Sequence, residues 1–194
     1  MTLQLCSIAI PPEAGMRWRM YSRYGWHQAL LRLFGDSEPK TLLWHVEKSS
    51  EFGAYCTILT DGHLVTTDEM PLRIRTKPYP TEFLQARRYA FEIELSPRRT
   101  DRASGKKRAV QPEDLVPWFC NHSAQWGFRT DSLQLEDWYV PSFYRRGERL
   151  VMPSASFAGV LTVTDRERFI NSAMHGIGSR LRFGFGLLRL IPIS

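Results

Sequence analysis

The sequence predicts an α+β protein of two successive units, each an antiparallel β-sheet with helices packed on one face. Three observations support this prediction. The chain has 194 residues, which is enough for two units of about 100 residues each. Hydrophobic residues make up 43% and charged residues 24%, as in ordinary globular proteins. Short alternating hydrophobic stretches, typical of strands, also recur in similar order with helical stretches in both halves.

The first half is predicted to contain a strand, a helix and three further strands. Residues 3–10 alternate between hydrophobic and polar, and Pro11 ends this strand. Residues 22–35 predict a helix, because hydrophobic residues recur at helical spacing between the N-cap residue Ser22 and Gly35. Further strands are predicted over residues 41–50, 54–62 and 87–97.

The second half is predicted to follow the order helix, strand, strand, helix, strand after the strand at 87–97. The helices are expected at 111–128 and 165–176, and the strands at 132–146, 149–164 and 185–193. A sheet built in this order in each half predicts two tandem ferredoxin-like (RRM-like) domains. We place the N-terminal domain at residues 1–97, a basic crossover or hairpin at 98–111, and the C-terminal domain at 112–194.

The amino-acid composition indicates the class of binding partner and the cellular compartment of the protein. The formal net charge of +6 favours a polyanionic partner. The three cysteines are widely separated and form no C-x-x-C pair, which argues against a disulfide framework or a thiolate zinc site and for a reducing compartment. The N-terminus lacks a basic leader, and no stretch approaches about 18 hydrophobic residues. We therefore expect a cytoplasmic protein with no membrane association.

A glycine-rich stretch, GIGSRLRFGFG, occupies residues 176–186. It is not a phosphate-binding loop of the G-x-x-x-x-G-K-[ST] type, and it follows a predicted helix rather than a strand, unlike a dinucleotide-binding loop. It could be only a helix end followed by a tight turn. Alternatively, Arg180 and Arg182 beside an unobstructed backbone suit contact with phosphate.

The C-terminal segment FAGVLTVTDRERFINSAMHGIGSRLRFGFGLLRLIPI closely resembles the CasE family of CRISPR-associated proteins. Shorter likenesses occur in the same order at YGWHQALLRLF and SPRRTDRASGKKRAV. The resemblance implies two ferredoxin-like domains and a subtype I-E-like endoribonuclease that cuts precursor CRISPR RNA. Cleavage on the 3′ side of a repeat stem-loop would leave a 5′-hydroxyl and a 2′,3′-cyclic phosphate. The resemblance also implies that the protein retains its product RNA and joins other subunits of a surveillance complex.

The resemblance assigns candidate catalytic residues to the first helix. Tyr24 and His27 stand three residues apart and therefore share one flank of that helix. Their Y-x-x-H spacing matches the family's catalytic tyrosine and histidine, which implies that His27 transfers the proton and that Tyr24 holds the 2′-oxygen or the phosphate. His175, beside the glycine-rich loop, is the alternative. Leu181 stands where family members commonly carry a lysine, which leaves a non-catalytic RNA-binding subunit as the competing function.

No metal or cofactor is expected, because the sequence lacks the clustered carboxylates of a two-metal nuclease and a histidine can move the proton. RNA binding is expected from two basic clusters and from the glycine-rich loop. The expected RNA-binding residues are Lys106, Lys107, Arg108, Arg145, Arg146, Arg149, Gly176, Gly178, Arg180, Arg182 and Gly184. The arginines at 145–149 lie at the predicted turn between two strands, where the resemblance implies a hairpin that grips the RNA stem.

Overall fold

A computed structural model describes residues 3–50, 53–65, 72–101, 105–145 and 148–194. The chain divides into two compact units that are not consecutive in sequence. The N-terminal unit comprises Met1–Pro80 together with Arg180–Gly184. The C-terminal unit comprises Thr81–Ser179 and Phe185–Ser194. A short piece of the glycine-rich loop therefore belongs to the N-terminal unit.

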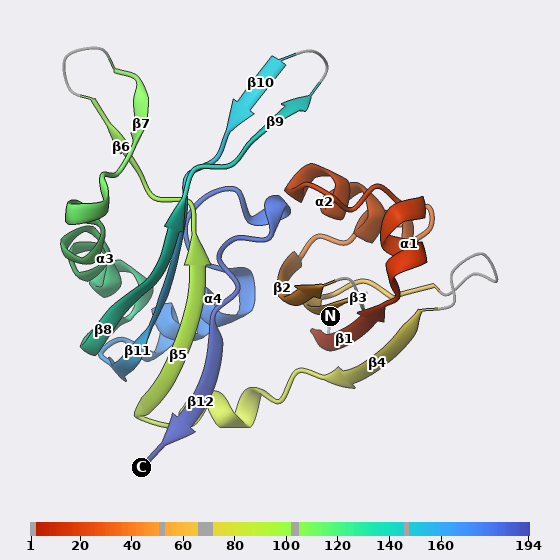
Figure 1. Ribbon diagram of the computed structural model, residues 1–194. Coiled ribbons are helices and arrows are strands. Elements are labelled where there is room, and N and C mark those ends of the chain that lie inside the picture. Colours follow the sequence, from red (N-terminus) through yellow and green to blue (C-terminus); the bar gives the residue numbers. More distant parts are fainter. Residues whose placement is uncertain (1–2, 51–52, 66–71, 102–104, 146–147) are drawn as a thin grey trace. The chain divides into compact units, whose positions relative to one another are not determined.

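The N-terminal unit is a four-stranded antiparallel sheet with its helices on one side (Figure 1). Its elements are β1 (Gln4–Ile10), α1 (Pro12–Arg17), α2 (Arg23–Arg32), β2 (Leu42–Ser50), β3 (Gly53–Thr60) and β4 (Arg73–Pro78). The strands lie in the order β2-β3-β1-β4. The core of the unit lies between this sheet and the helices, where Ile8, Leu30 and Ile58 are fully buried.

The C-terminal unit repeats this arrangement with added hairpins. It contains η1 (Thr81–Gln85), β5 (Arg88–Leu95), β6 (Arg98–Thr100), β7 (Lys107–Ala109), η2 (Pro112–Asp114), α3 (Leu115–Ser123), η3 (Ala124–Trp126), β8 (Phe128–Tyr139), β9 (Ser142–Arg145), β10 (Glu148–Val151), β11 (Ser154–Val163), α4 (Arg166–His175) and β12 (Arg189–Ile193). The main sheet has the order β12-β5-β11-β8, so its first strand again lies between its third and fourth. The prediction of two ferredoxin-like domains is confirmed.

Aromatic side chains fill the core of the C-terminal unit. The Phe119 ring of α3 lies 4.7 Å from the Phe157 ring of β11, and the Phe169 ring of α4 lies 5.1 Å from the Tyr89 ring of β5. Both helices therefore cover the same face of the sheet. In the described part of the chain, no helix combines the length and the hydrophobicity that crossing a membrane would require.

The boundary between the units differs from the one predicted at residue 97. The strand over 87–97 was expected to complete the first domain, but β5 pairs with β11 and β12 in the second sheet. The fourth strand of the first sheet is instead β4, in a stretch where the sequence predicted no strand. This strand is difficult to recognise because Arg73, Arg75 and Lys77 alternate with only one large hydrophobic residue, Ile74.

Two other predicted elements are divided more finely in the structure. The helix expected over 111–128 consists of α3 flanked by the 3-10 turns η2 and η3. The two long strands expected at 132–146 and 149–164 become four, because a separate β9–β10 hairpin extends from β8 and β11. The basic hairpin expected at 98–111 is confirmed as β6 and β7.

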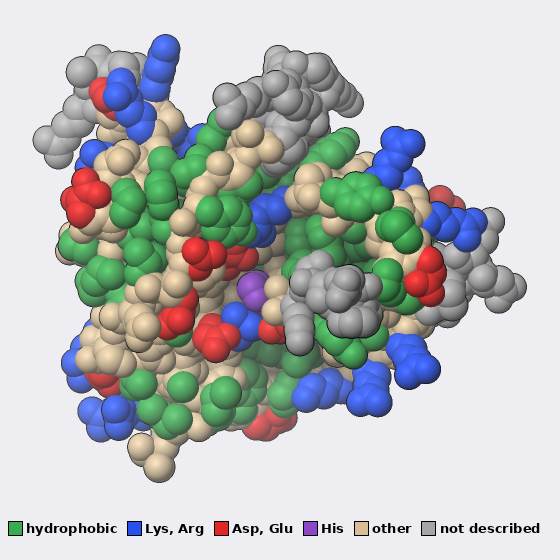
Figure 2. Space-filling view, in the orientation of Figure 1, with side chains coloured by type: hydrophobic (Ala, Val, Ile, Leu, Met, Phe, Trp, Pro, Cys, Tyr) green, Lys and Arg blue, Asp and Glu red, His purple; other side chains and the backbone are tan. Residues whose placement is uncertain are grey.

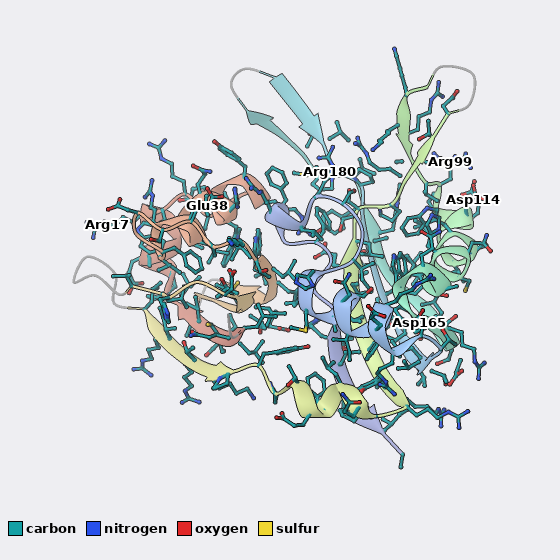
Figure 3. All side chains as sticks on the ribbon, turned by 180° about the vertical axis from the view of Figure 1, so that it is seen from behind. Arg17, Glu38, Arg99, Asp114, Asp165 and Arg180 are labelled. Atoms are coloured by element: carbon teal, nitrogen blue, oxygen red, sulfur yellow. The ribbon has the colours of Figure 1, made fainter. Side chains whose placement is uncertain are left out.

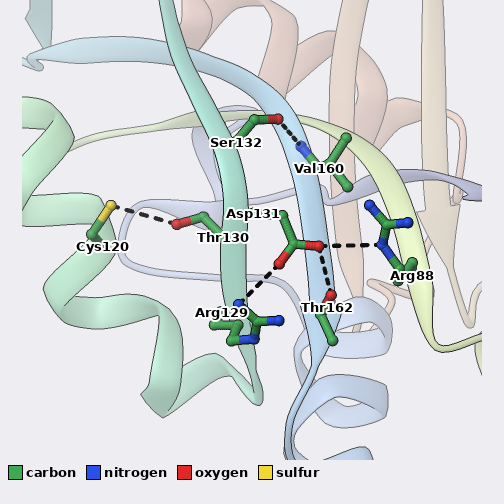
Figure 4. A network of polar contacts seen from close by, with 8 residues as sticks. All are labelled: Arg88, Cys120, Arg129, Thr130, Asp131, Ser132, Val160 and Thr162. Atoms are coloured by element: carbon green, nitrogen blue, oxygen red, sulfur yellow. Dashed lines mark hydrogen bonds and ion pairs between the residues drawn. The ribbon is translucent and has the colours of Figure 1, made fainter.

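Asp131 on β8 joins three strands of the second sheet (Figure 4). Its carboxylate accepts hydrogen bonds from Thr162 on β11 at 2.7 Å and from Arg88 on β5 at 3.2 Å, and it pairs with Arg129 at 3.2 Å. The Thr162 hydroxyl and the two guanidinium groups hold the pKa of Asp131 below its usual range.

A carboxyl whose pKa is lowered by folding stabilises the fold above its unfolded pKa, and this stabilisation is lost as the pH falls through the folded pKa. Asp131→Asn should therefore make the melting temperature less sensitive to acid. We expect the difference in melting temperature between pH 7 and pH 3 to be smaller in this variant than in the wild type. Glu136→Gln, on the same strand, is the control and should keep the wild-type difference.

Candidate functional site

The candidate catalytic residues lie on α2, and the cap of this helix fixes where it begins. The Ser22 hydroxyl accepts a hydrogen bond from the Gly25 backbone N–H at 3.1 Å, which satisfies one of the free donors at the helix start. Tyr24 and His27 follow within the first two turns. Tyr24 is half-buried, and His27 is only 7% exposed. The imidazole therefore has a fixed environment rather than a freely solvated one.

The tip of the glycine-rich loop packs against α2. This tip, Arg180–Gly184, contains the 3-10 turn η4 (Leu181–Phe183). The Phe183 ring lies 5.7 Å from the His27 ring, and the Arg23 guanidinium donates a hydrogen bond to the Phe183 carbonyl at 3.0 Å. The loop tip and the Y-x-x-H helix come from opposite ends of the sequence, yet they form one site within the N-terminal unit.

Trp44 on β2 holds the same loop tip from a second direction. Its indole N–H donates a hydrogen bond to the Arg182 carbonyl at 3.1 Å. Gly184 has a φ of +79°, and Trp44 Cζ3 lies 2.6 Å from the position that a Cβ atom on Gly184 would occupy. No other residue can adopt this conformation so close to the ring without displacement. At Gly184, the missing side chain makes room for an indole ring.

Two of the predicted arginines, Arg180 and Arg182, lie on the loop tip. Arg180 adopts a left-handed conformation with a φ of +65°, which costs a non-glycine residue about 1 kcal/mol. Arg182 is 73% exposed and forms an ion pair with Glu38 at 3.6 Å. Figure 3 labels Arg180 on the loop and Glu38 on the N-terminal unit. The predicted residues Tyr24 and His27 therefore lie on α2, and Arg180, Arg182 and Gly184 lie on the loop tip that packs against this helix.

The two ends of the glycine-rich loop belong to the C-terminal unit. Gly176 ends α4 with a φ of +86°. The Ile177 N–H donates to the Gly186 carbonyl at 3.0 Å, and the Gly186 N–H donates to the Glu94 carbonyl at 2.8 Å. These bonds close the base of the loop, while Gly178 is exposed. His175 is also exposed, and its Nδ1 atom lies 3.2 Å from the Asn171 carbonyl oxygen.

The predicted basic clusters lie on the two hairpins of the C-terminal unit. Lys106, Lys107 and Arg108 are exposed along the β6–β7 hairpin, where Arg108 forms an ion pair with Asp101 at 3.1 Å. Arg145 and Arg149 stand on the paired strands β9 and β10. Arg146 lies outside the residues that the structure describes.

Four residues of the site were not predicted: Arg23, Glu38, Trp44 and Phe183. Arg23 and Phe183 each adjoin a predicted residue in sequence, so their neighbours offered a signal. Trp44 offered none, because an alternating hydrophobic strand predicts a core tryptophan equally well. Trp44 also stacks on Trp26 of α2 with ring centroids 6.0 Å apart, as a core residue would.

The fold and site define a protein with two ferredoxin-like units and an arginine-bearing glycine-rich loop docked on a tyrosine–histidine helix. The family model described as "CRISPR associated protein" matches residues 5–192. The chain therefore belongs to this family of CRISPR-associated proteins. No curated protein sequence matches it.

Several solved structures have a similar fold. A structure of Thermus thermophilus Cse3 bound to an RNA representing a pre-cleavage complex matches with a TM-score of 0.84 and 22% identity, over 99% of this chain and 100% of that one. The CRISPR-associated protein Cas6e from Escherichia coli K-12 matches with a TM-score of 0.75 and 22% identity, over 98% and 100%. A chain of a CRISPR RNA-guided surveillance complex matches with a TM-score of 0.69 and 18% identity, over 97% and 100%. These similarities establish the fold.

Proposed function

We propose that this protein is an endoribonuclease of the CasE type that cuts CRISPR repeat RNA on the 3′ side of a stem-loop. The observation that carries the proposal is the site on α2, where the loop tip bearing Arg180 and Arg182 packs against the helix of Tyr24 and His27. The membership of the CRISPR-associated family supports the RNA substrate. Cse3, a protein of similar fold, is a CRISPR endoribonuclease whose structure holds a bound 19-nucleotide RNA.

The proposed chemistry is attack of a ribose 2′-oxygen on the adjacent phosphorus. His27 takes the 2′-hydroxyl proton while the new O2′–P bond forms, and it gives a proton to the 5′-oxygen as the P–O5′ bond breaks. Tyr24 holds the 2′-oxygen or the phosphate. Arg180 and Arg182 stabilise the charge that develops on the phosphate oxygens; they do so as fixed cations, because arginine does not release its proton. The products are a 2′,3′-cyclic phosphate and a 5′-hydroxyl.

The RNA stem is proposed to lie against the basic hairpins and to remain bound after cleavage. Lys106, Lys107 and Arg108 are exposed on the β6–β7 hairpin, and the sequence of the β9–β10 segment supplies Arg145, Arg146 and Arg149. A double-stranded RNA stem is recognised mainly through its phosphates and its shape, which exposed cations on a hairpin suit. If the protein keeps its product RNA, it enters a CRISPR ribonucleoprotein complex as one subunit, together with the other proteins that bind this RNA.

Cleavage in the presence of excess EDTA tests this function. Because His27 and the arginines supply proton transfer and charge stabilisation, the purified protein should cut its own repeat RNA once, at the 3′ base of the stem. The rate should match that in Mg²⁺ within about threefold, and mass spectrometry should find the cyclic phosphate on the upstream fragment. Cleavage only with Mg²⁺ would contradict the chemistry. Tight binding without any cleavage would instead establish the non-catalytic RNA-binding subunit.

A further inference from the structure

We propose that the helix-free face of the N-terminal sheet is a second RNA site, which binds a single-stranded segment next to the repeat stem. This inference rests on the proposed function for the identity of the RNA. The helices α1 and α2 both lie on one side of this sheet (Figure 1). The hydrophobic core is on that side, so the alternate residues of each strand point to the opposite face.

The strand register places an aromatic ring and cations in two rows at one end of this face, whereas Leu59 and Leu43 further along it are buried. Tyr55 on β3 pairs with Ala9 on β1, which pairs with Arg73 on β4. Directly paired residues of antiparallel strands lie side by side on the same face. In the next row, Ser7 stands between Thr57 and Arg75.

The Tyr55 side chain is exposed although β3 is an inner strand of the sheet. Tyr55 is 57% exposed, although the residues on either side of it in β3, Ala54 and Cys56, are buried. Ala9 and Ser7, between β3 and β4, have small side chains, so little side chain stands above the backbone there. A cavity of about 370 Å³, lined among others by Tyr55, Ala9, Arg73 and the carboxylate residue Glu13, opens beside the ring. This volume is at the lower end of the range of small-molecule sites.

Positive charge continues along the edge of the same face. Arg73, Arg75 and Lys77 alternate on β4 and are all exposed. In Figure 2, Lys and Arg side chains follow the line of β4 at the lower right. An exposed aromatic ring that stacks on a base, next to cations that track a phosphate backbone, is the arrangement by which sheets bind single-stranded nucleic acid. A row of cations beside a tyrosine therefore fits single-stranded RNA better than a protein surface of mixed charge.

The test compares a bare repeat stem-loop with the same stem-loop extended by ten unpaired uridines. The extension should raise the affinity of the wild-type protein, measured by fluorescence polarisation at low salt. Tyr55→Ala should reduce the affinity for the extended RNA roughly 5- to 150-fold, the effect of losing one stacked base. Arg73→Gln with Arg75→Gln should reduce the slope of log affinity against log salt by about 0.7 per lost phosphate contact.

Matched controls separate a specific site from general charge and from misfolding. Tyr21→Ala removes a tyrosine that is 75% exposed elsewhere in the unit, and Arg32→Gln with Lys40→Gln removes the same charge from α2 and the loop after it. These controls should keep the wild-type affinity for the extended RNA. Melting temperatures report whether each variant is folded. With 5-iodouridine in the extension, ultraviolet light should crosslink the peptide that contains Tyr55.

Wild-type affinity in both the Tyr55 and the arginine variants would overturn the proposal, and the β4 charges would then serve to prevent pairing at the sheet edge. Crosslinks confined to other peptides would overturn it as well. Failure of the proposed function gives a different result: the wild-type protein would not cut the bare stem-loop, whereas binding of the extension would still be measured.

Discussion

His27→Ala should lower the single-turnover rate of repeat RNA cleavage by about 10²- to 10⁴-fold, the contribution of a well-placed proton-transfer group. The imidazole packs against Phe183 of the loop tip, so His27→Ala removes a proton-transfer group that the fold holds in a defined position. Affinity for the RNA should change little, because a neutral imidazole adds little to phosphate binding. Rapid mixing of RNA with saturating protein measures the rate, and filter binding measures the affinity.

His175→Ala is the matched control for this variant. His175 adjoins the glycine-rich loop in sequence but is exposed on the C-terminal unit. The control should therefore cut at the wild-type rate. If His175→Ala loses the activity and His27→Ala keeps it, then the proton is transferred by the last residue of α4, and the assignment to α2 is wrong. The melting temperature of His27→Ala shows whether removal of a buried side chain has only unfolded the protein.

Gly184→Ala should lower the cleavage rate about 10²-fold even at saturating RNA, the size of effect that a displacement of about 1 Å in a catalytic site produces. A methyl group at this position would lie 2.6 Å from Trp44 Cζ3, so the loop tip or the indole has to move. Because the Trp44 N–H holds the Arg182 carbonyl, such a movement would carry the arginines away from α2.

Gly178→Ala is the control because it introduces the same backbone strain without the collision. Gly178 and Gly184 have φ values of +82° and +79°, but a Cβ atom on Gly178 would meet only a Leu95 methyl group, at an ordinary contact distance of 3.6 Å. Each substitution costs about 1 kcal/mol for the left-handed conformation. If Gly178 lies against phosphate, its variant should lose affinity while keeping the rate at saturation. An equal loss of rate in both variants would mean that strain, and not the position of the loop tip, controls cleavage.

The sequence allowed the elements to be predicted better than their assignment to sheets. Alternating hydrophobic residues identify β1, β3 and β5 because both faces of a half-buried strand leave a pattern of period two. The same pattern cannot say which sheet a strand joins, and the strand at 87–97 was assigned to the wrong unit for this reason. The edge strand β4 was not predicted, because the side chains on one of its faces are all cationic and its other face carries only one large hydrophobic residue, Ile74.

The candidate site was partly predictable for a related reason. Helical spacing alone places Tyr24 and His27 on one flank of a helix, so the local pair could be inferred. The role of Trp44 in anchoring the loop tip could not be inferred, because its hydrogen bond to the Arg182 carbonyl joins residues 138 positions apart in the chain. Contacts at that distance depend on the completed fold and leave no periodic trace in the sequence.

The placement of Arg180–Gly184 within the N-terminal unit affects how the protein is completed on the ribosome. Residues 1–80 emerge first, yet the five residues that close their site are translated about 100 residues later. At about 5–20 residues per second, this interval lasts roughly 5–20 s. During that time, the nascent unit has its tyrosine and histidine but not its arginines. Catalytic competence is therefore deferred until almost the whole polypeptide has been synthesised, and a chain truncated before residue 180 would have an N-terminal unit without its loop tip.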